Sequence, residues 1–101
     1  MFRELAKPPE TSTAEKAMEV MRAWVIDGAL HVSLMPTAFE KKEAWGILLA
    51  DVTRHIANAL AEAKGLDNAE TVAVIANLYN RELNRPTDEP TGEFVDEDKR
   101  A

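Results

Sequence analysis

The stretch RAWVIDGALHVSLMP, Arg22 to Pro36, contains two apolar runs separated by one Asp27-Gly28 pair. Asp-Gly between β-branched and aromatic residues is a strong signal for a two-residue hairpin turn, because both turn positions need positive φ. With this turn Ile26 pairs with Ala29, and the pairing of every other residue follows. The stretch therefore predicts two antiparallel strands with a defined set of side chains on each face.

One face of the predicted hairpin is wholly apolar. Its cross-strand pairs are Val25–Leu30, Ala23–Val32 and Met21–Leu34. We expect this face to be the core face, because a shift of one residue would place His31 and Ser33 inside instead. The opposite face, here called the outer face, is mixed and carries a tryptophan. Its residues are Val20, Arg22, Trp24, Ile26, His31, Ser33 and Met35.

A long helix is predicted after the hairpin, over residues 42–64. One continuous helix from Thr37 would be about 42 Å long, too long for a domain of this size, so we expect a separate turn over residues 37–40. Gly65 should end the helix as a left-handed C-cap, with Leu66 packing back. The apolar positions form one stripe at helical spacing: Trp45, Leu48, Leu49, Val52, Ile56, Ala59, Leu60 and Ala63.

A second helix should follow directly, with Asp67 as its N-cap and Pro86 just beyond its end. Its stripe is Val72, Ile75, Ala76, Tyr79 and Leu83, widened by Val74 and Leu78, so we expect it to be well covered. A short loop makes the two helices antiparallel neighbours. The predicted fold class is therefore α+β, a β-hairpin followed by two antiparallel α-helices (ββαα) packed on one face of the hairpin.

The chain divides into three parts by composition. Residues 1–16 form a polar lead-in, residues 17–86 a single α+β domain, and residues 87–101 an acidic tail predicted to be disordered. The tail holds six acids and two bases, and Phe94-Val95 is its one apolar pair. The alternative is that this pair docks as a short strand on a sheet edge.

Composition narrows the functional classes. The sequence has no cysteine, which excludes disulfides, thiol nucleophiles and thiolate metal sites. Most of the net charge of −6 comes from the tail, so no basic stripe is left to bind nucleic acid. The start of the chain lacks the apolar segment of a signal peptide, and no apolar run approaches a membrane span. We expect a cytoplasmic protein without a membrane or nucleic-acid partner.

Two side-chain pairs could carry chemistry, and we expect neither to do so. Asp51 and His55 lie four residues apart on a helix, which suits a shared metal, but no third ligand is evident and an ion-pair face explains them. His31 and Ser33 alternate on the outer face, where no carboxylate orients the imidazole and no nucleophile elbow is present. The four glycines are scattered and form no phosphate-binding loop. The sequence therefore predicts neither an enzyme nor a cofactor or metal site.

Trp24 is the strongest functional candidate, because a fully exposed indole in mid-strand is unusual. Two explanations are open. A second copy of the hairpin covers the outer face, which would make the chain a homodimer, or the N-terminal segment with Phe2 and Leu5 folds over it.

The run from Met21 onward resembles a family of small bacterial proteins of unknown function. The resemblance covers residues 18–84 and rests on the segments AWVIDG, MPTAFE, AWG and LLADVTRHIA. In the family pattern an Asp-Pro pair stands where this sequence has Lys41-Lys42, which suits a helix start there. The resemblance implies a fold and a bacterial origin, and no site residues.

These observations favour a non-catalytic protein-interaction module that self-associates through the outer face. The alternative is a small-ligand-binding or accessory enzyme-like domain with a pocket near His31, Trp24 and Arg22.

Overall fold

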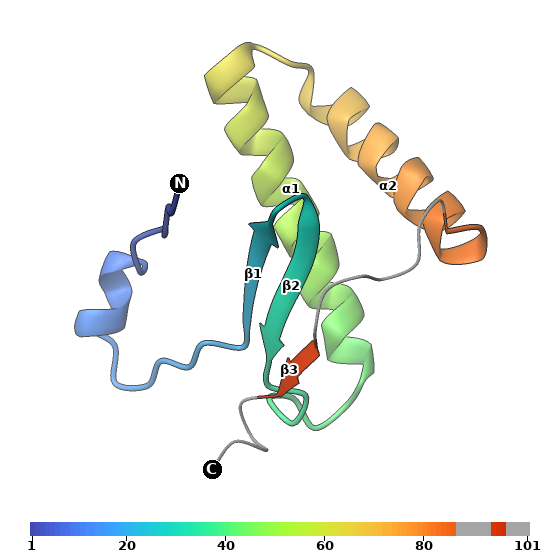
Figure 1. Ribbon diagram of the computed structural model, residues 1–101. Helices are drawn as coiled ribbons and strands as arrows, with labels where there is room; N and C mark the ends of the chain where they lie inside the picture. Colours follow the sequence, from blue (N-terminus) through green and yellow to red (C-terminus); the bar gives the residue numbers. More distant parts are fainter. Residues whose placement is uncertain (87–93, 97–101) are drawn as a thin grey trace.

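The computed structural model describes residues 1–86 and the backbone of residues 94–96. Its elements follow the predicted ββαα order (Figure 1). A short 3-10 turn, η1, spans Pro9–Ser12 and precedes the strands β1 (Met21–Ile26) and β2 (Ala29–Leu34). The helices are α1 (Glu43–Lys64) and α2 (Asn68–Asn84), and a third strand, β3 (Phe94–Asp96), completes the sheet.

The hairpin has the predicted register in every pair, from Met21↔Leu34 to Ile26↔Ala29. Asp27 and Gly28 have φ of 50° and 83°, as a turn with two left-handed positions requires. The fold class and the assignment of side chains to the two faces are thereby confirmed.

The end of α1 and the start of α2 have the predicted capping residues, Gly65 and Asp67. Gly65 is left-handed, with φ 68°, and its N–H donates to the Ala61 carbonyl at 2.9 Å. The Asp67 carboxylate accepts a hydrogen bond from the Glu70 N–H at 2.8 Å, which caps α2. Leu66, which was predicted to pack back, is 46% exposed.

The tail contributes a strand to the sheet. Phe94–Asp96 pairs in parallel with β2, in the register Val32↔Phe94 to Leu34↔Asp96, which gives the sheet order β1-β2-β3. This is the docked strand that the sequence left as the alternative, so the prediction of a disordered tail was wrong for these three residues. The remainder of that segment, residues 87–93 and 97–101, lies outside the described part of the chain.

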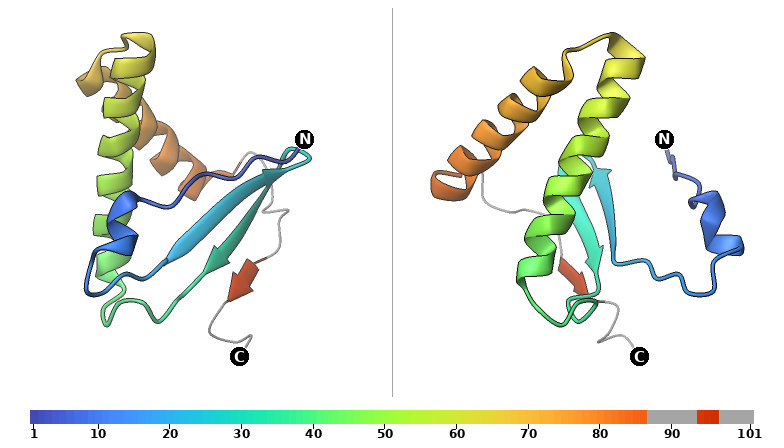
Figure 2. Two further views of the ribbon diagram at one scale, coloured as in Figure 1. Left: turned by 90° about the vertical axis from the view of Figure 1, so that its left-hand side faces the viewer. Right: turned by 180° about the vertical axis from the view of Figure 1, so that it is seen from behind.

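The elements diverge from one another in space. The hairpin lies near α1 at its open end and separates from it towards the turn (Figure 2, left). The second helix diverges from α1 in the same way, away from the loop that joins them (Figures 1 and 2). The core is consequently small: Ala57 is the single buried hydrophobic residue among those described.

This divergence corrects two predictions about burial. The buried side of α1 is centred on Ala57, beside the predicted stripe, and the stripe members Leu49, Val52 and Ile56 are exposed. The second helix is not well covered, because only its first turns lie close to α1 and its apolar side chains further along are exposed: Val74, Leu78, Tyr79 and Leu83. The physical reason is the angle between the helices, which periodicity does not encode.

Candidate functional site

The structure brings the outer-face residues together on one side of the hairpin. Arg22 lies opposite Ser33 and Trp24 opposite His31, while the Met35 N–H donates to the Val20 carbonyl at 3.0 Å. These six residues are half-buried, and the seventh, Ile26 next to the turn, is exposed. The residues predicted as a candidate interface therefore form one continuous surface.

The N-terminal arm, residues 1–19, contacts this surface at Trp24. The rings of Phe2 and Trp24 have centroids 5.2 Å apart and an interplanar angle of 36°. Phe2 itself stays 79% exposed and Leu5 89% exposed, so the contact is narrow and Leu5 adds no cover. The N-terminal segment thus contacts Trp24, as one of the two sequence-based explanations had it, but only Phe2 of the two named residues makes a ring contact.

Arg22 joins the arm to the hairpin by charge. Its Nη1 lies 3.0 Å from Glu4 Oε2, and its Nη2 lies 3.0 Å from Glu19 Oε2. The side chains of Arg22, Glu4 and Glu19 are 37%, 51% and 60% exposed. Ion pairs this open to solvent contribute about 1 kcal/mol or less, so the arm is held weakly.

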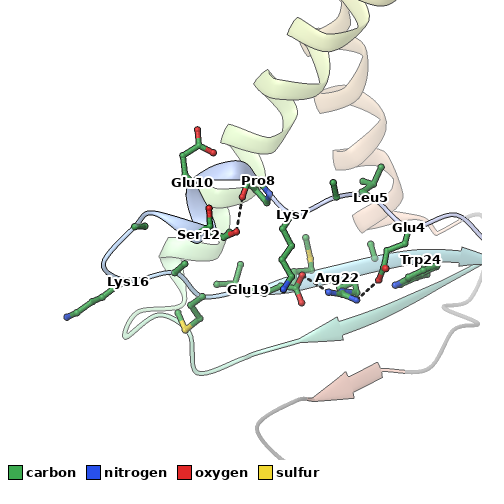
Figure 3. Close-up of a pocket in the computed structure, with 18 of the residues that line it drawn as sticks. Glu4, Leu5, Lys7, Pro8, Glu10, Ser12, Lys16, Glu19, Arg22 and Trp24 are labelled. Carbon is green, nitrogen blue, oxygen red and sulfur yellow. Dashed lines mark hydrogen bonds and ion pairs between the residues drawn. The ribbon is translucent and has the colours of Figure 1, made fainter.

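A cleft of about 1400 Å³ separates the arm from β1 (Figure 3). Arg22 and Trp24 line it from the strand, and charged side chains of both signs, including Lys7 and Glu10, line it from the arm. Figures 1 and 2 place the arm on the side of β1 opposite β2. The cleft therefore runs beside the edge of the sheet.

That edge is unpaired in the described part of the chain. In this hairpin Ile26, Trp24 and Arg22 direct their backbone groups towards β2, because the pair next to a two-residue turn is hydrogen-bonded and the pattern alternates. Met21, Ala23 and Val25 direct theirs to the other side, where no backbone hydrogen bond joins them to the arm. The arm faces the edge of β1 without pairing with it.

The face predicted to be the core is covered only near the open end of the hairpin. Met21, Val32 and Leu34 are half-buried, but Val25 is 75% exposed and Leu30 57% exposed. This corrects the expectation that the whole face packs inward, and its cause is the separation of the hairpin from α1 towards the turn. Exposed apolar side chains thus lie on the strands as well as on both helices.

The two pairs considered for chemistry lie in different places. Asp51 and His55 lie on α1, apart from the outer face, whereas His31 and Ser33 are part of the outer face. Asp51 Oδ1 accepts a hydrogen bond from Arg54 Nη1 at 2.8 Å, and His55 is exposed. Within residues 1–86 and 94–96, no three His, Cys, Asp or Glu side chains gather in a way that could hold a metal ion. Nor is any described helix long and apolar enough to cross a membrane.

Sequence reasoning named Phe2 as one residue that could cover Trp24, but it missed the ion pair between Glu4 and Arg22 and the free strand edge. Nothing in the sequence marks Glu4 as a partner of the hairpin, because it lies far from Arg22 along the chain. The edge could have been found, since the turn that sets the register also decides which backbone groups of β1 face outward.

The fold is thus a small α+β domain whose arm, hairpin and helix pair match one family over most of their length. The chain belongs to the family described as "Domain of unknown function (DUF5076)", whose model matches residues 4–87. This confirms the resemblance seen in the sequence.

One solved structure supports the assignment. The chain is similar, with 39% identity and a TM-score of 0.71, to a protein of Rhodopseudomonas palustrus CGA009 described as a "putative pyruvate dehydrogenase". The match covers 92% of this chain and 95% of that one. No curated protein matches the sequence.

Proposed function

We propose that this chain is a non-catalytic interaction module that functions as a homodimer. The observation that supports this proposal is the exposure of its apolar side chains. Val25, Ile47 and Leu83 are each at least 66% exposed, on three different elements. A single copy leaves on its surface the residues that a domain of this size needs for its core.

The surface area leads to the same proposal. The chain has 8986 Å² of accessible surface, whereas a compact monomer of 11.2 kDa has about 5,700 Å². The excess is larger than the about 1,000–2,500 Å² that each chain buries in a permanent dimer, so it is enough to supply such an interface. A second copy of the chain is always present and exposes the same apolar residues. Two-fold dimers are also the commonest homo-oligomers.

The test is the mass in solution, measured by sedimentation velocity over a range of concentrations. We expect a dimer that dissociates on dilution, with dye binding to apolar surface increasing as monomer forms. Val25→Lys should shift the equilibrium to monomer with an unchanged circular dichroism spectrum. Asn77→Lys adds the same charge at an exposed polar position of α2 and should leave the dimer intact. A wild-type monomer at high concentration would contradict the proposal.

A second function is favoured by the cleft beside β1 and by the name of the Rhodopseudomonas protein. Arg22 supplies a cation and Trp24 an aromatic wall, which together suit a small carboxylate such as pyruvate. Both glutamates that hold Arg22 would have to release it. Titration of Trp24 fluorescence with pyruvate, in a Trp45→Phe background, tests this: saturation at low concentration supports ligand binding, and no change rejects it.

A further inference from the structure

We infer that the free edge of β1 is where two copies meet, with β1 of one copy pairing antiparallel to β1 of the other about a two-fold axis at Ala23. This inference rests on the proposed homodimer and names its contact. It joins the two sheets into one of six strands, in the order β3-β2-β1-β1-β2-β3.

The edge itself is the first argument. Strands that stay at the edge of a sheet in a monomer carry proline, bulges or inward-pointing charges that prevent pairing. Met21–Ile26, the sequence MRAWVI, has no proline, pairs with β2 without a bulge, and has a single charge, on Arg22. Its outward backbone groups at Met21, Ala23 and Val25 are therefore suited to accept another strand.

The register follows from which residues face outward. Outward residues must pair with outward residues, so the two-fold axis can pass through Arg22, Ala23 or Trp24. An axis at Arg22 sets two guanidinium groups opposite each other, which is unfavourable. An axis at Trp24 sets Met21 opposite the turn residue Asp27 of the second copy. Both alternatives create a mismatch.

An axis at Ala23 matches every pair. Met21 lies opposite Val25 of the second copy, and Val20 opposite its Ile26, so both pairs are apolar. Arg22 lies opposite Trp24 of the second copy, where a guanidinium can stack on the indole. Ala23 meets itself, and its small side chain lets the strands approach. The strand is self-complementary in this register alone among the three.

The same pairing accounts for the exposure of Val25. Antiparallel strands place the turn end of one hairpin beside the open end of the other. Val25, which is 75% exposed in the single chain, gains Met21 of the second copy as its neighbour. The end of the hairpin that separates from its own α1 is thereby supported by the half-buried end of its partner.

The arm does not prevent this contact. It touches the hairpin through two exposed side chains of its own, Phe2 on Trp24 and Glu4 on Arg22, and the cleft keeps it apart from the strand edge (Figure 3). The incoming strand enters the cleft, and Trp24 and Arg22 exchange their arm contacts for each other across the two copies.

The test uses the absence of cysteine from the sequence. In the variant Ala23→Cys each chain has one thiol, and the two-fold register places the two Cα atoms about 5.5 Å apart, within the range that a disulfide bridges. We expect mild oxidation to convert the dimer into a covalent one. Ala29→Cys, an equally small change at the far side of the same hairpin, should stay uncross-linked.

A second variant examines the backbone contact. Ala23→Pro removes an N–H that the hairpin does not use, so the monomer fold is kept, but the strand pair at the axis loses its central hydrogen bonds. We expect loss of the dimeric mass with retained circular dichroism. The wild type could be dimeric while Ala23→Cys fails to cross-link and Ala23→Pro stays dimeric. That result would reject the pairing of the two β1 edges but not the homodimer. A wild-type monomer overturns both.

Discussion

Phe2 and Trp24 are in contact as a tilted ring pair with centroids 5.2 Å apart, although Phe2 lies nineteen residues before β1 and Trp24 in the middle of that strand. This contact and the ion pairs of Arg22 with Glu4 and Glu19 join the arm to the hairpin. Since Phe2 is 79% exposed, the stacking contributes at the low end of the range for aromatic pairs, about 0.5 kcal/mol.

Replacing Phe2 should therefore release the arm at little cost to stability. In a Trp45→Phe background, Phe2→Ala should shift Trp24 emission to longer wavelength and lower the free energy of unfolding by under about 1 kcal/mol. Leu5→Ala, at a position that is 89% exposed, is the matched control and should change neither. An unchanged emission in Phe2→Ala would show that the ring contact does not form in solution.

Filling the position of Ala57, the one buried hydrophobic residue in the described part of the chain, should destabilise the fold. Ala57→Leu adds three carbons at a site with no exposure, and overpacking of this kind costs about 1–3 kcal/mol. Ala59→Leu makes the same change at an exposed position of the same helix and should cost little. Urea denaturation compares the two variants. Equal midpoints would mean that the surroundings of Ala57 accommodate the larger side chain without cost.

Removing the cap of α2 should weaken that helix. Asp67→Ala abolishes the acceptor of the Glu70 N–H, and loss of such a cap costs about 1 kcal/mol. Asn77→Ala, in the exposed middle of the helix, serves as the control. Thermal unfolding should show a lower melting temperature for Asp67→Ala, and an equal temperature in both variants would mean that water replaces the carboxylate without loss.

Breaking the pairing between β2 and β3 should lower the melting temperature by several degrees. Val95 lies at the centre of β3, opposite Ser33, and Val95→Pro disfavours the pairing of the strand. Deletion of residues 87–101 should have the same effect, measured by calorimetry. A deletion that leaves the melting temperature unchanged would support the sequence-based prediction of an undocked tail.

Local signals made much of the fold predictable from the sequence. Asp27-Gly28 determined the turn and the register, and Gly65 and Asp67 determined where one helix ends and the next begins. Each acts on residues within a few positions of itself. The strand Phe94–Asp96 could not be predicted in the same way, because its partner Val32 lies more than sixty residues away.

The residues of the outer face could be predicted from the sequence, but the segments that contact them could not. Alternation along the strands correctly grouped Trp24, Arg22 and their neighbours on one face. It could not show that Phe2 reaches Trp24, or that Val25 lies on a part of the hairpin distant from α1. Periodicity tells which residues share a face, whereas the angle between elements decides whether that face is covered.

The position of β3 also bears on how the chain folds. The hairpin pairs strands that are adjacent in sequence, and α1 and α2 are joined by a short loop, so both units form from local contacts and should form fast. The strand Phe94–Asp96 reaches β2 only after both helices have been traversed. Its docking closes a loop of about sixty residues, so refolding should end with a slower step in which the sheet gains its third strand.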